Sequence, residues 1–204
     1  MSRIPTVDPS RMSVDQRQVY DAVVQGPRGK MVGPLRVVLH NAELADKWAK
    51  FGEDLRYNTS VPRILSELAI IITARRWNSD LEWHAHSVEA LKAGLSAETV
   101  EAIRIAALPK FKSLIEARVY EFVRCMQEFG NVPDDLYEDL RNDLGVAGIM
   151  ELSSISGYYT LVAMTLNVHN VPLPDEASDN PLPVIGSGLS LTPLPEFKMN
   201  ELSF

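Results

Sequence analysis

Helix start and stop signals recur along most of this 204-residue chain, and they constrain its fold more than any other feature. Ser13 and Gln16 form a capping box, in which each side chain bonds the other residue's backbone N–H at the start of a helix. No segment alternates apolar and polar residues over several positions, and no Asn-Gly or Asp-Gly hairpin turn occurs. The sequence therefore predicts an all-α fold.

The same signals place the individual helices. Asn41 is a typical N-cap, and Ser60 opens the next helix. Ser79 and Glu82 form a second capping box. Gly145 separates the last two helices. The expected helices cover approximately residues 13–26, 42–56, 60–77, 79–94, 96–109, 110–129, 134–144 and 146–168.

Chain length and proline content predict the domain organisation. A chain of this length forms one domain, or one domain and a tail. Six of the thirteen prolines lie between Pro172 and Pro195, and proline blocks helix formation. We expect an N-terminal extension with one helix (1–32), a helical domain (33–170) and an extended Pro-rich tail (171–204). Apolar residues in the tail suggest that it packs against a neighbouring surface: Val184, Ile185, Leu189, Leu191, Phe197 and Phe204.

Charge and hydropathy exclude several classes of partner. The net charge of −7 and the absence of a basic run argue against nucleic acid, which requires clustered Lys and Arg. The longest apolar run, Leu68 to Ile72, is far shorter than the roughly 20 residues that span a bilayer. The N-terminus lacks the apolar stretch of a signal peptide. We therefore expect a cytoplasmic protein with no nucleic-acid or membrane partner.

Common catalytic motifs are missing from the sequence. It contains no Gly-x-Ser-x-Gly, no phosphate-binding loop and no dinucleotide-binding motif. The single cysteine, Cys125, can form neither an intramolecular disulfide nor a Cys-x-x-Cys pair. It lies in an apolar-periodic segment with no histidine nearby in sequence, which favours a buried structural thiol over a nucleophile.

Glu67 immediately precedes the apolar run Leu68 to Ile72. At 3.6 residues per turn the side chains of this run point in every direction, so we expect protein on all sides of the helix. Burial there disfavours the charged form of a carboxylate unless a cation or hydrogen-bond donors face it. Two interpretations remain open: a salt bridge to Arg63 one turn earlier, or a functional group.

Glu82 and His86 are four residues apart, so their side chains lie on one face of a helix. A carboxylate beside an imidazole sets its tautomer and can act with it as a general acid/base pair. The structural alternative is that Ser79 and Glu82 only cap the helix and that His86 is a hydrogen-bonded core residue. His84 and His86 diverge by about 200° on a helix, so they do not form a metal pair, and we expect no metal site.

At these residues the sequence resembles the carboxymuconolactone decarboxylase family, within the AhpD-like superfamily. The resemblance covers roughly residues 33–172 and implies an AhpD-like helical bundle. The matching stretches are Leu39-His40-Asn41-Ala42-Glu43-Leu44, Ser66-Glu67-Leu68-Ala69-Ile70-Ile71, Leu81-Glu82-Trp83-His84-Ala85-His86, Ala93-Gly94-Leu95-Ser96 and, more weakly, Gly157-Tyr158-Tyr159.

The peroxide-reducing members of that superfamily use a glutamate, a Cys-x-x-Cys pair and a histidine. Glu67 and His86 match the glutamate and the histidine, whereas Ser79 and Glu82 occupy the two cysteine positions. Peroxide reduction in that class needs one thiolate to attack and a second thiol to resolve the product. An alkylhydroperoxidase or peroxiredoxin label would therefore apply by family inheritance, without the chemistry.

The decarboxylase-like branch also lacks the cysteine pair, and its members act without a cofactor on small cyclic carboxylates from aromatic-compound breakdown. The resemblance implies loss of carbon dioxide from a small carboxylated or lactone substrate. The resulting enolate must be stabilised and protonated. His86 would be the proton donor, with Glu67 and Glu82 orienting it or exchanging protons. Weaker candidates for the pocket wall are Trp83, Tyr57, His40 and Ser79.

Assembly is the last property that the resemblance implies. Family members form trimers or hexamers, so we expect a homo-oligomer (dimer, trimer or hexamer) that binds a small molecule and needs no cofactor. The alternative is a non-catalytic oligomeric binding protein that keeps the fold without the site. It predicts that Glu67 and His86 do not meet, or that they meet in a sealed core.

Overall fold

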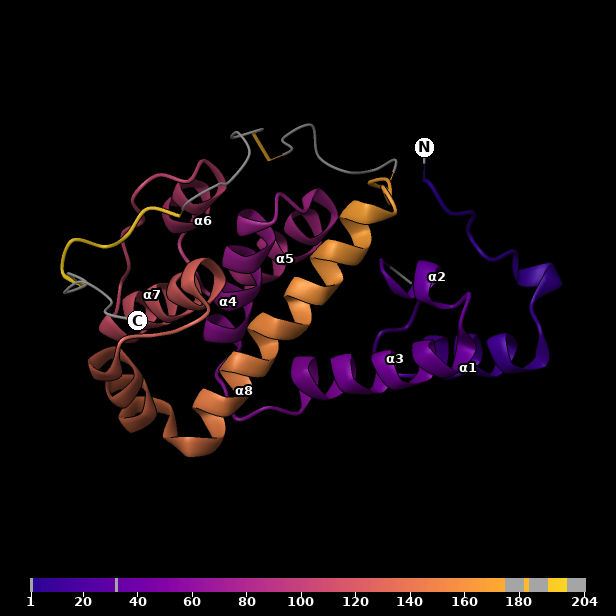
Figure 1. Ribbon diagram of the computed structural model, residues 1–204, viewed down its shortest axis with the longest axis horizontal. Helices are drawn as coiled ribbons and strands as arrows, with labels where there is room; N and C mark the ends of the chain where they lie inside the picture. Colours follow the sequence, from indigo (N-terminus) through magenta and orange to yellow (C-terminus); the bar gives the residue numbers. More distant parts are fainter. Residues whose placement is uncertain (1, 32, 175–181, 184–190, 198–204) are drawn as a thin grey trace.

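The computed structural model describes residues 2–31, 33–174, 182–183 and 191–197, and all regular structure within them is helical (Figure 1). The prediction of an all-α fold is confirmed. The elements are a 3-10 turn η1 (Pro9–Arg11) and the helices α1 (Val14–Gln25), α2 (Leu35–Val38), α3 (Ala42–Tyr57), α4 (Arg63–Arg76), α5 (Asp80–Lys92), α6 (Ala97–Arg104), α7 (Leu114–Phe129) and α8 (Asp134–Val168).

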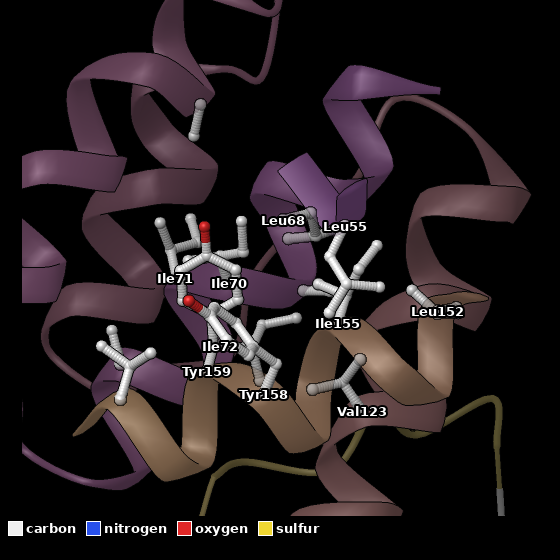
Figure 2. Packing of buried hydrophobic residues seen from close by; sticks show 14 of the residues in the cluster. Leu55, Leu68, Ile70, Ile71, Ile72, Val123, Leu152, Ile155, Tyr158 and Tyr159 are labelled. Carbon is white, nitrogen blue, oxygen red and sulfur yellow. The ribbon is translucent and has the colours of Figure 1, made fainter. Parts of the chain in front are cut away.

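Helix α4 forms the centre of the core, packed against α5, α7 and α8. Every residue from Leu65 to Arg75 is buried, as the apolar run predicts. Figure 2 shows Leu68 and Ile72 of α4 in one cluster with Ile155 of α8. Burying an aliphatic side chain of this size stabilises the fold by about 1.5–3 kcal/mol, so this helix anchors the bundle.

The N-terminal unit, defined as α1, α2 and α3, extends to one side of this core (Figure 1). Helices α1 and α2 pack on α3, and α3 contacts α8. The loop between α1 and α2 is thereby held beside the bundle, where it forms part of the wall of a cavity.

Two of the predicted helix caps are confirmed. The Ser13 hydroxyl accepts from the backbone N–H of Gln16, whose side chain bonds back to Ser13, so the capping box is complete. Asn41 caps α3 by accepting from the backbone N–H of Leu44.

The other two predicted caps are wrong. Helix α4 begins after Pro62, and the Ser60 hydroxyl donates to Glu151 of α8 instead of capping. Ser79 stands at the N-cap of α5 but makes no side-chain cap bond. Its hydroxyl is fully buried without a partner, and its backbone N–H donates to the carbonyl of Ala74 and not to Glu82. Tertiary packing therefore places the side chains of Ser79 and Glu82 where they do not form the expected capping box.

The boundary between α6 and α7 also differs from the prediction. Helix α6 ends at Arg104, because the backbone turns into the left-handed region at Ala106 (φ 54°). Helix α7 begins only at Leu114, with Ser113 as its cap. The predicted break at Gly145 is confirmed, since its φ of 74° divides α8 into two segments.

The described part of the tail is not helical and packs against its own chain. Leu182, Leu191 and Leu194 are buried. The backbone N–H groups of Leu191 and Leu194 donate to Glu128 and Glu121 of α7. Four of the apolar tail residues named above lie outside the described residues: Val184, Ile185, Leu189 and Phe204. Among the described helices, none combines the length and apolar character needed to cross a bilayer.

Candidate active site

Glu67 of α4 and His86 of α5 form a buried pair. The Glu67 Oε2 atom lies 2.8 Å from the His86 Nδ1 atom, and the two residues are 2% and 5% exposed. Because an ionised carboxylate only accepts hydrogen bonds, Nδ1 carries the proton in this contact. The neutral ring then has its free lone pair on Nε2, the nitrogen that can exchange a proton with a ligand.

Arg63 lies one turn before Glu67 and completes a small ionic cluster. Its Nη2 atom is 3.4 Å from Oε1 of Glu67 and 2.7 Å from Oε2 of Glu89. The salt bridge to Arg63 and the contact with His86 therefore coexist on one carboxylate, and a functional role of Glu67 stays a prediction. Arg63 is about half exposed, so solvent weakens its share of the interaction.

Glu82 is buried in α5 and is not the partner of His86. Its Oε2 atom has no hydrogen-bond partner, and the described residues place no cation in ion-pair contact with it. Burial raises the pKa of its carboxyl group well above the ordinary value of 4.5. The side chain therefore favours the neutral acid, which can donate a hydrogen bond.

Two tyrosines of α8 complete the inner wall. The Tyr159 ring meets the His86 ring edge to face, with 4.9 Å between centroids, and the Tyr158 ring meets that of Tyr159 at 5.4 Å. Burial raises the pKa of Tyr159 and brings that of Tyr158 to about 12. Both phenols therefore stay protonated at neutral pH, and the Tyr158 hydroxyl donates to the backbone carbonyl of Trp48 at 3.4 Å.

A cavity of about 770 Å³ opens beside these groups. It is lined by Glu82, His86, Tyr158 and Tyr159, and by apolar side chains from α2, α5 and α8. This volume is in the range of small-molecule sites. The histidine of the pair therefore lines a cavity, whereas the binding-protein alternative predicts a pair that is sealed in the core.

The outer wall of the cavity is basic. Arg28 and Lys30 come from the loop between α1 and α2, Arg36 comes from α2, and Arg56 comes from α3. None of the four is among the candidates predicted from the sequence. A usable signal was present for the first three, because they lie within the short Gly- and Pro-rich stretch 26–36 of an acidic chain. The sequence gives no such signal for Arg56, since its position at the cavity depends on how α3 packs against α8.

The four weaker pocket candidates do not line this cavity. Trp83 follows Glu82 by about 100° around α5 and lines a separate cavity of about 270 Å³. Tyr57 is exposed at the end of α3, and Ser79 is buried at the start of α5. His40 bonds the carbonyl of Pro5 through Nε2. Their role in a substrate pocket stays a prediction that this cavity does not support.

In the part of the chain that the structure describes, neither a metal cluster nor a reactive thiol accompanies the pair. Within the described ranges, no group of three or more His, Cys, Asp or Glu side chains is arranged to hold a metal ion. Cys125 is buried in α7, and desolvation raises the pKa of its thiol to about 11. It is not among the residues that line the cavity.

Comparison with solved structures identifies the fold. An uncharacterized peroxidase-related protein from Silicibacter sp. TM1040 superimposes with a TM-score of 0.69 at 13% identity, over 86% of this chain and 93% of that one. An AhpD-core peroxidase-related protein from Ralstonia eutropha JMP134 gives 0.68 at 15% identity, over the same shares. No protein-family model and no curated protein matches the sequence. The chain has the AhpD-like helical fold. Sequence identities this low do not indicate which activity the chain has.

Proposed function

We propose that this protein is a cofactor-independent enzyme of the carboxymuconolactone decarboxylase type, acting by acid/base chemistry on a small carboxylated or lactone substrate. The observation that carries the proposal is the Glu67–His86 pair, whose histidine lines an open cavity of about 770 Å³. A histidine whose Nδ1 is held by a carboxylate offers Nε2 for proton transfer to a bound molecule.

The proposed reaction breaks the bond between a substrate carboxylate and a carbon conjugated to a carbonyl. The electron pair of that bond passes into the carbonyl system to form an enolate, and carbon dioxide is released. The protonated Nε2 of His86 then gives its proton to the enolate carbon, and neutral His86 regains a proton from water. Glu67 stabilises the imidazolium before the transfer, and the cavity's hydrogen-bond donors stabilise the enolate oxygen.

The peroxidase alternative has less support. It needs an attacking and a resolving thiol, whereas Ser79 and Glu82 stand at the cysteine positions and Cys125 does not line the cavity. The binding-protein alternative predicts a sealed pair, so the open cavity supports the enzyme over it.

A substrate panel tests the proposal. Small β-keto acids and carboxylated lactones are incubated with the protein, and carbon dioxide release is measured. We expect turnover of at least one compound, and a loss of about 100-fold or more in His86→Gln. His169→Gln is the matched control, because His169 lies at the end of α8 outside the cavity. Thiol-dependent peroxide consumption, or equal activity in His86→Gln, would contradict the proposal.

A further inference from the structure

One face of α3 brings two arginines and a tyrosine together at the cavity. Gly52 is buried there, and a Cβ atom built on it would lie 2.0 Å from the Tyr158 hydroxyl and 2.8 Å from Nη2 of Arg28. Arg56 follows Gly52 by one turn, so it emerges from the same face. Arg28, Arg56 and Tyr158 all line the cavity.

The two guanidinium groups carry charge that the described protein does not neutralise. The Nε atoms of Arg28 and Arg56 are buried and have no hydrogen-bond partner. Among the described residues, no carboxylate lies within ion-pair distance of either side chain, although exposed arginines such as Arg141 have such partners. Buried N–H donors without acceptors are unfavourable, so this wall is suited to an acceptor from outside.

The same wall is close to the catalytic pair. Arg56 acts electrostatically on Tyr159, and Arg28 acts on Tyr158. The Tyr159 ring in turn contacts His86 at 4.9 Å. Arg28, Arg56, Tyr159 and His86 line the same cavity, so an anion held by the arginines shares that cavity with the imidazole. Glu82, which lines the same cavity, does not compete for the arginines because it favours its neutral form.

We propose that Arg28 and Arg56, which lie beside the Tyr158 hydroxyl, form a carboxylate-binding subsite that orients the substrate toward His86. The role of this subsite in catalysis rests on the proposed function, whereas its ability to bind a carboxylate does not. A guanidinium group presents parallel N–H donors that match the two oxygens of a carboxylate. Lys30 and Arg36 are exposed at the same cavity, where they can attract anions without holding them in one orientation.

Calorimetric titration of the full chain tests the subsite with three probes: succinate, its uncharged diamide and inorganic phosphate. We expect saturable binding of succinate, and binding of the diamide and of phosphate that is at least about tenfold weaker. Arg28→Gln and Arg56→Gln should each weaken succinate binding by about 10- to 100-fold. The succinate affinity of Arg56→Lys should lie between those of the glutamine variants and the wild type, because lysine keeps the positive charge but lacks the parallel N–H donors of a guanidinium group. Arg141→Gln, which removes an exposed arginine outside the cavity, should bind like the wild type.

Four outcomes would overturn the subsite: no succinate binding by the wild type, undiminished binding in both glutamine variants, equal binding of the diamide, or tighter binding of phosphate. His86→Gln should retain succinate binding. If it alone loses binding, the anion lies at the imidazole and the subsite is wrong. Binding that depends on the arginines without turnover in the substrate panel would keep the subsite and refute the proposed reaction.

Discussion

The His86 Nδ1 atom lies 2.8 Å from Oε2 of Glu67, in a contact that joins two helices through two buried side chains. The contact determines which imidazole nitrogen is available, because the bonded Nδ1 cannot also serve a ligand. Within the described residues, Nε2 makes no hydrogen bond, and the residue lines the cavity. The contact with Glu67 therefore holds the His86 ring in one orientation, and the cavity gives a bound molecule access to that ring.

Replacing His86 with Gln should separate catalysis from stability. The Gln amide can still donate to Glu67, so we expect a loss of no more than about 1–2 kcal/mol, which lowers the Tm by a few degrees. Turnover should fall by about 100-fold or more, because Gln cannot transfer a proton at neutral pH. Calorimetric melting and the carbon dioxide assay measure the two effects. A collapse of the fold would instead indicate that His86 is a structural core residue.

Glu82 should make the protein less stable as pH rises. Its pKa is raised in the folded state by burial, so above about pH 4.5 the unfolded chain ionises while the folded chain holds the proton. The folded state then binds more protons, and stability decreases with pH at up to about 1.4 kcal/mol per unit. Glu82→Gln removes this dependence, so its advantage over the wild type in urea denaturation should grow between about pH 5 and pH 8.

Glu89→Gln is the control for this measurement, because its stability relative to the wild type should change with pH in the opposite direction. Hydrogen bonding to Lys92 lowers the pKa of Glu89, so its contribution to stability is present above the unfolded pKa and lost in acid. The variant should be less stable than the wild type at pH 8 and should approach it in acid. An advantage of Glu82→Gln that is constant with pH would show that Glu82 is ionised in the folded protein.

Gly52 should not tolerate a side chain. A Cβ atom there would lie 2.0 Å from the Tyr158 hydroxyl, so Gly52→Ala must displace that ring and Arg28 with it. We expect destabilisation by about 1–3 kcal/mol and weaker succinate binding. Gly157→Ala in α8 is the matched control, since a Cβ there meets nothing within 4 Å. It should stabilise the helix by about 0.5–1 kcal/mol. Equal effects of the two variants would refute the close approach.

Cys125 should be dispensable for activity. Its thiol is buried in α7 and its pKa is raised to about 11, so little of the reactive thiolate forms at neutral pH. Cys125→Ala should keep full turnover and lose about 1 kcal/mol of stability. A thiol reagent such as dithionitrobenzoate should label the native protein slowly and the unfolded protein at once. A large loss of activity in the alanine variant would restore the peroxidase alternative.

Helical periodicity and caps predicted most of the fold. The run Leu68 to Ile72 indicated a helix enclosed on all sides, and α4 has that position, because a helix with apolar residues around its whole circumference is stable only inside the core. The Ser79 cap failed because its hydroxyl is buried without a partner in the folded protein. Local patterns identify helices well, and they identify individual side-chain contacts less well.

The sequence by itself determined that the chain is all-α, that Glu67 adjoins an apolar run enclosed by protein and that Glu82 and His86 share a helix face, since these follow from the 3.6-residue period. Only the tertiary structure decided which carboxylate holds His86. Glu67 lies on a different helix, and the crossing of α4 and α5 brings it within 2.8 Å, whereas Glu82 on the same helix remains unpaired. Only the packing of α3 against α8 could place Arg28 and Arg56 at the same cavity, because contacts between distant segments depend on how the helices assemble.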